Sequence, residues 1–110
     1  EKITATLVVY PTENKAVFKC SDDTLNTIYE LSRWTLQLCM EDAFTDCPWR
    51  ERSQWLGDLQ PEAMINYYTF AANDLVKKAL GEYANGISEE GWIPCVYPSQ
   101  LKTRGNLPTW

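Results

Sequence analysis

The sequence predicts a mainly α-helical chain with a short β segment at its N-terminus. Residues 4–10 are rich in β-branched and aromatic side chains and stop at Pro11, which is typical of a strand. Three later segments carry apolar residues at helical spacing, and Gly and Pro separate them. The 110 residues leave room for one small domain at most.

The N-terminal elements follow in order. Residues 16–20 are either a second short strand or an extended lead-in to the first helix. Ser21 is the expected N-cap of that helix, and the negative charges of Asp22 and Asp23 suit its first turn. The helix is expected to run to about Met40. Its apolar residues cover more than one stripe, so we expect neighbours on most of its sides.

A long connection is expected from residue 41 to about residue 60, since Pro48 and Gly57 disfavour a continuous helix. Long connections within compact domains are usually functional. Pro61 suits the first turn of a second, strongly apolar helix, with Asp58 or Gln60 near its start. Asn73 with Asp74 predicts a break and a new N-cap, and the third helix should end near Gly86. The rest reads as extended loop.

The long connection concentrates charged and aromatic side chains. Its residues 46–58 hold three carboxylates, two arginines and two tryptophans without an amphipathic period: Asp46, Glu51, Asp58, Arg50, Arg52, Trp49 and Trp55. Aromatic rings stack on the C–H face of a sugar, and carboxylates handle protons and a developing positive charge. The combination is typical of a sugar-cleaving site.

The same stretch resembles the signature of bacterial α-L-rhamnosidases, in the form Asp-Cys-Pro-x-Arg-Glu-Arg-x-x-Trp-x-Gly-Asp. Residues 18–30, and Gly91-Trp92-Ile93-Pro94 with Pro98, are also similar to segments of that family, in the family's order. The resemblance implies the first hairpins of an (α/α)6 barrel at a junction with a β-sandwich. Residues 1–20 would be the β lead-in from a preceding β-domain. Residues 21–110 would be the N-terminal part of the catalytic domain, so the chain is expected to be a fragment.

The resemblance also implies roles for individual residues. Glu51 falls on the general acid that protonates the leaving glycosidic oxygen. Asp46 and Asp58 fall on acidic residues that hold rhamnose or shape the charge around the acid. The implied substrate-binding residues are Arg50, Trp55, Trp92 and Trp110. The family acts on terminal α-L-rhamnosides with inversion, and its general base is a glutamate far downstream that has no counterpart here.

Other interpretations stay open at this stage. Glu51 and Asp58 could pair with Arg50 and Arg52 in a structural ion-pair network. Asp46 could cap the turn before Pro48. The chain could belong to another (α/α)6 glycosidase, or to a non-catalytic sugar-binding or scaffold module.

Composition restricts the partners. The net charge is −5 and there is no basic run, which argues against nucleic acid and anionic membranes. There is no histidine and no closely spaced cysteine pair, so neither a metal site nor a cofactor is expected. The cysteines are expected to be thiols, with Cys20, Cys39 and Cys95 buried. The expected partners are a carbohydrate substrate and the remainder of the same enzyme, in the bacterial cytoplasm or periplasm.

Overall fold

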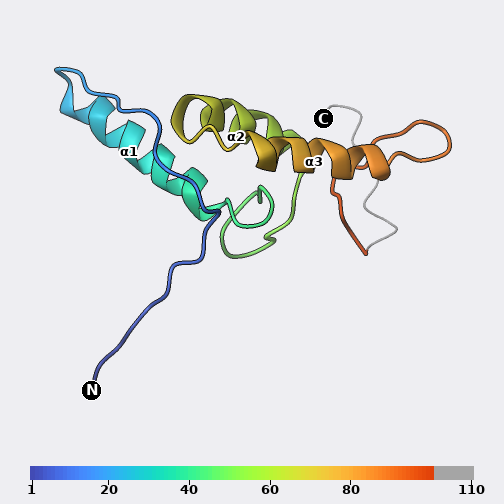
Figure 1. The fold of residues 1–110 in the computed structure, drawn as a ribbon, viewed down its shortest axis with the longest axis horizontal. Coiled ribbons are helices and arrows are strands. Elements are labelled where there is room, and N and C mark those ends of the chain that lie inside the picture. Colours follow the sequence, from blue (N-terminus) through green and yellow to red (C-terminus); the bar gives the residue numbers. More distant parts are fainter. Residues whose placement is uncertain (101–110) are drawn as a thin grey trace.

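The computed structural model describes residues 1–100, and these form three α-helices. They are α1 (Asp23–Leu38), α2 (Leu56–Thr69) and α3 (Asn73–Asn85). Helices α2 and α3 follow each other closely, whereas a long loop joins α1 to α2 (Figure 1). The prediction of a mainly α-helical chain is confirmed by these three helices. None of the described helices is both long enough and apolar enough to cross a membrane.

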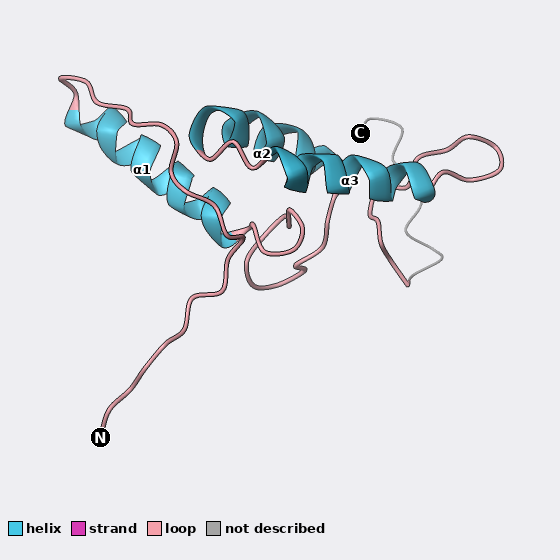
Figure 2. Ribbon diagram, in the orientation of Figure 1, coloured by secondary structure: helices cyan, strands magenta, loops and turns pink. Residues whose placement is uncertain are grey.

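The predicted N-terminal β segment is wrong, because residues 1–100 contain no strand (Figure 2). Residues 1–8 are exposed and extend away from the helices (Figure 1). Their β-branched side chains suit a strand, but a strand needs a neighbour to accept and donate its backbone hydrogen bonds. The only β-type contacts of the described residues are two isolated bridges elsewhere, Met40–Phe44 and Trp55–Val96.

Residues 10–20 form an extended lead-in that returns along α1 (Figure 1). The amide of Tyr10 donates to the Met40 carbonyl at 2.7 Å, beyond the C-terminus of the helix. Near the other end, Asn26 donates to and accepts from the backbone of Cys20. The N-cap is Asp22 rather than the predicted Ser21, since its Oδ1 accepts from Thr24 N at 2.8 Å. The shift by one residue adds a charged cap at the positive end of the helix dipole.

Helix α2 begins at Leu56, two to four residues before the start predicted at Asp58 or Gln60. The amide of Leu56 donates to the Cys95 carbonyl at 2.9 Å, so a distant segment satisfies one of the free N–H groups of the first turn. Pro61 then lies inside the helix and cannot donate to the carbonyl of Gly57. The start was mispredicted because its hydrogen-bond partner lies 39 residues away in the sequence.

The turn between α2 and α3 is built around Asn66, which is fully buried. The Asn66 carbonyl accepts from the amides of Phe70 and Ala71, and its Oδ1 accepts from Ala72 N at 3.0 Å. Ala71 takes a left-handed conformation with φ of 54°. This side chain explains why α3 starts at Asn73, where the sequence predicted a break, although the N-cap is Ala72.

The core lies between the C-terminal end of α1, the loop after it, and one face of α2 and α3. Its buried members are Leu36, Met40, Phe44, Leu59, Phe70, Ala72, Leu75, Val76, Ala79 and Tyr83. Large apolar side chains of α1 and α2 remain exposed outside this core: Leu25, Ile28, Leu31, Trp34, Met64, Ile65, Tyr67 and Tyr68. The first two helices therefore have further apolar faces that residues 1–100 do not cover.

Candidate active site

The predicted site residues begin on a loop whose two ends are tied together. The Asp46 amide donates to the Ser53 carbonyl at 3.1 Å, and the Ser53 amide donates to Asp46 Oδ1 at 2.9 Å. Arg52, just before this closure, has a φ of 45°, in the left-handed region. Its side chain forms an ion pair with Glu41. Residues 46–53 are thus non-helical, as the sequence predicted, and they form a closed loop.

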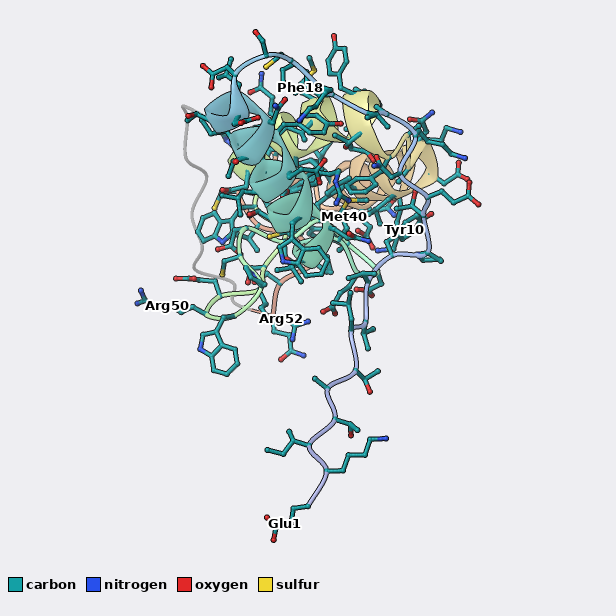
Figure 3. The ribbon with its side chains drawn as sticks, turned by 90° about the vertical axis from the view of Figure 1, so that its left-hand side faces the viewer. Glu1, Tyr10, Phe18, Met40, Arg50 and Arg52 are labelled. Carbon is teal, nitrogen blue, oxygen red and sulfur yellow. The ribbon has the colours of Figure 1, made fainter. Side chains whose placement is uncertain are left out.

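Glu51 lies on the exposed side of this loop. Its backbone amide donates to the Cys47 sulfur, and that thiol donates to Glu51 Oε2, each at 3.3 Å. Arg50 Nε lies 3.5 Å from Glu51 Oε1, but the Arg50 side chain is 87% exposed. It points away from the body of the molecule (Figure 3). The Glu51 carboxylate is therefore supported from one side and remains accessible to a ligand.

A pocket of about 380 Å³ lies between α1, α2 and the start of the loop. Three carboxyl groups reach it: Asp46 from the loop, and Asp58 and Glu62 from successive turns of α2. Its remaining lining comes mostly from apolar and small side chains: Leu31, Ser32, Thr35, Leu36, Cys39, Pro61 and Ile65. Glu51 is not among the described lining residues. Its ligand atom lies within 4.8 Å of that of Asp46, so Asp46 connects Glu51 to the pocket.

The pocket favours protonated acids. Burial, followed by the charges of Asp58 and Asp46, raises the pKa of Glu62 to about 8. Burial and the Asp46 charge also raise the pKa of Asp58 above its usual value, although its own backbone hydrogen bond opposes this. None of the ion pairs between described residues includes one of these three carboxyls. These carboxyls therefore have no cation to offset their charge, which favours their protonated forms.

The predicted substrate-binding residues are not gathered in this pocket. Trp55 is half-buried and caps α2, and its backbone bridges to Val96. Trp92 is 56% exposed on the loop after α3, and neither ring lines the pocket. Trp110 lies outside the described residues. The structure brings Asp46, Asp58 and, through Asp46, Glu51 together.

The sequence reasoning missed Glu62. It is four residues after Asp58, so both side chains share a helix face once α2 is known to start at Leu56. The sequence prediction left the start of this helix open between Asp58 and Gln60, and a start at Gln60 would put Asp58 before the helix. The shared face of Asp58 and Glu62 was therefore not recognised, nor was Glu62 as the third carboxyl of a pocket.

The cysteines are thiols rather than disulfides. Cys39 and Cys95 are buried as predicted, but Cys20 is only half-buried because it precedes the first turn of α1. Burial, with nearby carboxylates, raises the pKa of Cys39 to about 11, so this pocket residue is a neutral thiol. Asp46, Cys47 and Glu51 have ligand atoms close enough to share a metal ion. However, all three already take part in the loop's own hydrogen bonds.

This chain is similar to known rhamnosidases. Residues 13–110 match the family described as the bacterial alpha-L-rhamnosidase 6 hairpin glycosidase domain. A protein from Formosa agariphila called alpha-L-rhamnosidase is 33% identical over 78 residues, which is 71% of this chain and 8% of that protein.

Two solved structures share the fold. The GH78 family rhamnosidase of Bacillus sp. GL1 matches 93% of this chain and 10% of its own, with a TM-score of 0.86 and 37% identity. A rhamnosidase from Klebsiella oxytoca, with rhamnose bound, matches 73% of this chain and 16% of its own, with a TM-score of 0.68 and 38% identity. The chain thus spans less than a fifth of each of these relatives.

Proposed function

Because this chain belongs to the bacterial α-L-rhamnosidase six-hairpin glycosidase domain family, we propose that it carries the general acid of an inverting α-L-rhamnosidase. The substrates are terminal α-L-rhamnosides, and the general acid is Glu51. Asp46 and Asp58 bind the sugar and shape the charge around the acid. The base that activates water lies outside this sequence, as the resemblance implies.

The position of Asp46 is the observation that supports the proposal. Asp46 lines the pocket with Asp58 and Glu62. A carboxylate oxygen of Asp46 also lies within 4.8 Å of a carboxylate oxygen of Glu51. A sugar seated against Asp46 and Asp58 would have its glycosidic oxygen near the exposed Glu51. The rhamnose bound to the Klebsiella oxytoca protein supports a monosaccharide as the ligand of such a pocket.

The chemistry follows from this placement. Glu51 gives its proton to the glycosidic oxygen as the C–O bond breaks, and the bonding electron pair leaves with that oxygen. Water attacks the anomeric carbon from the opposite face. In inverting enzymes the acid and the base are about 6.5–9.5 Å apart to leave room for that water. The aspartates stabilise positive charge on the oxocarbenium-like transition state.

The test compares two rhamnosides in the full-length protein, one with a poor leaving group and one with an activated aryl leaving group. Glu51→Gln keeps the shape of the side chain but removes its proton. It should lower turnover of the poor substrate by about 10²–10⁴-fold, and that of the activated substrate much less. Asp58→Asn is the matched control, because loss of a charge that serves the sugar should weaken both substrates alike.

An equal effect of Glu51→Gln on both substrates, or no effect, would show that Glu51 is not the acid. A parent protein that binds rhamnose but hydrolyses neither substrate would instead support the sugar-binding module. A parent that prefers another glycoside would support a different (α/α)6 glycosidase.

A further inference from the structure

We propose that Gln54 is a positioning residue that holds the loop 46–53 against α3 and residues 95–97, so that Glu51 reaches the leaving group. The inference rests on the proposed function, since it concerns the orientation of the proposed acid. It comes from hydrogen bonds that the signature motif does not suggest, because Gln54 occupies one of its unspecified positions.

Gln54 is buried, with 5% of its surface exposed, although it lies within an otherwise open and charged stretch. Its side-chain Nε2 donates to Glu82 Oε2 at 3.0 Å and to the Tyr97 carbonyl at 2.8 Å. Its backbone carbonyl accepts from the Tyr83 hydroxyl at 2.7 Å and from the Tyr97 amide at 3.3 Å. One residue therefore contacts both α3 and the segment after it.

The position of the loop 46–53 depends on Gln54, because Gln54 directly follows the last residue of the loop. Ser53, the preceding residue, closes the loop through its backbone bonds with Asp46. Ser53 Oγ also donates to the carbonyl of Glu51 at 3.1 Å. On the other side, Leu56 is held by the Cys95 carbonyl. The fixed point at Gln54 thus sets where the closed loop stands, and the loop sets where the Glu51 carboxylate stands.

The position requires a neutral amide. Both hydrogens of Nε2 serve acceptors, and one acceptor is the Glu82 carboxylate, which Lys78 also contacts at 2.8 Å. A carboxylate at residue 54 would face Glu82 and a carbonyl with no proton to donate. Gln54 Oε1 is buried without a hydrogen-bond partner among the described residues. An unpartnered acceptor is costly, so the two Nε2 contacts have to outweigh it.

A positioning role differs measurably from a structural one. A loss of folded protein lowers the turnover of every substrate by the same factor. A displaced acid lowers turnover chiefly where protonation of the leaving group is needed, and a misplacement of about 1 Å can cost roughly a hundredfold. The ratio of activated to poor substrate therefore reports the position of Glu51.

The experiment uses the full-length protein with Gln54→Met, which keeps the side-chain length but removes both donated hydrogen bonds. We expect the ratio of kcat/KM for the activated rhamnoside to that for the poor one to rise about tenfold, with the rhamnose inhibition constant little changed. Tyr83→Phe removes the bond to the Gln54 carbonyl alone and should move the ratio in the same direction by less. Leu75→Ala, a truncation in the core of α3, is the stability control and should leave the ratio unchanged.

An unchanged ratio in both Gln54→Met and Tyr83→Phe would overturn the positioning role. If Gln54→Met does not fold, Tyr83→Phe alone decides in the same way. Glu51→Gln is measured alongside: if it too leaves the ratio unchanged, the assignment of the acid fails, and not the inference about Gln54 alone.

Discussion

At the scale of single residues, Glu62 is the described carboxyl whose pKa is raised to about 8. It lines the pocket together with Asp58 and Asp46, and its raised pKa reflects burial first and those charges second. The folded protein therefore binds a proton at Glu62 more tightly than the unfolded chain does. This contribution to stability is fully present below a pH of about 4.5 and is lost as the pH rises through about 8.

We expect Glu62→Gln to remove this pH dependence, because the amide keeps the neutral form at every pH. In the full-length protein, the variant and the parent should have similar Tm values at pH 5, and the variant should have the higher Tm at pH 9. Thermal unfolding followed by circular dichroism at both pH values measures the difference. Glu89→Gln, at an exposed position, is the control. A parent whose Tm relative to Glu62→Gln does not fall with pH would contradict the burial of this carboxyl.

The sequence could predict the loop residues but not their neighbours. Asp46, Glu51 and Asp58 were found from composition and motif spacing, which depend only on residues close in the chain. The approach of Glu62 to Asp46 depends on the packing of α2 beside the loop, and the anchoring of Gln54 depends on Glu82, Tyr83 and Tyr97. The start of α2 is likewise supported by the Cys95 carbonyl, near the other end of the described chain. Tertiary contacts of this kind leave no local pattern.

At the scale of elements, the C-terminal end of α3 depends on close contact with Tyr97. A Cβ added at Gly86 would lie 2.5–2.9 Å from three atoms of the Tyr97 ring, too close for an ordinary contact. Because Gly86 has a φ of −91°, the requirement comes from space rather than from backbone conformation. Tyr97 accepts from Gln54, so this contact also supports the base of the loop.

We therefore expect Gly86→Ala to lower the free energy of unfolding by about 1–3 kcal/mol, because the ring must move. Gly81→Ala is the matched control within the same helix, since nothing lies within 4 Å of its added Cβ. That change should stabilise by about 0.5–1 kcal/mol through helix propensity. Urea unfolding of the two variants measures both effects. Equal destabilisation by both would show that the Tyr97 ring does not fill the space at Gly86.

The N-terminal strands show the limit of propensity as a predictor. Residues 4–10 have strand composition, yet within the described residues they meet no neighbouring strand, and only Tyr10 bonds to the helical part. By contrast, the end of α3 near Gly86 was predicted correctly. The position was predicted from the usual role of glycine after a helix, but here the φ of −91° shows that Gly86 leaves room for Tyr97 instead of taking a left-handed conformation. A strand depends on a partner that no local pattern supplies.

At the scale of the whole molecule, the chain is less compact than a domain of its length. Its radius of gyration is 16.2 Å, whereas about 13 Å is expected for a compact domain of 110 residues. The apolar faces of α1 and α2 remain open, with Leu31 61% and Tyr68 73% exposed. Patches of this kind are normally covered by other protein.

The 110-residue chain expressed alone should therefore aggregate or fold poorly, and it should not hydrolyse rhamnosides. We expect strong binding of a hydrophobic dye and no cooperative thermal transition. Size-exclusion chromatography, calorimetry and a rhamnoside assay provide the measurements, with the full-length protein as the control. A sharp transition together with turnover by the isolated chain would contradict this prediction.

The anchor of the loop also sets an order of events during synthesis. Gln54 leaves the ribosome before its partner Tyr97, which lies 43 residues further along the chain. At about 5–20 residues per second, the loop has to wait roughly 2–9 seconds for the segment that fixes it. During that interval α1 and the loop can emerge, but the proposed acid has no defined position. The geometry proposed for the acid is therefore assembled late, after the helices that flank the loop have been made.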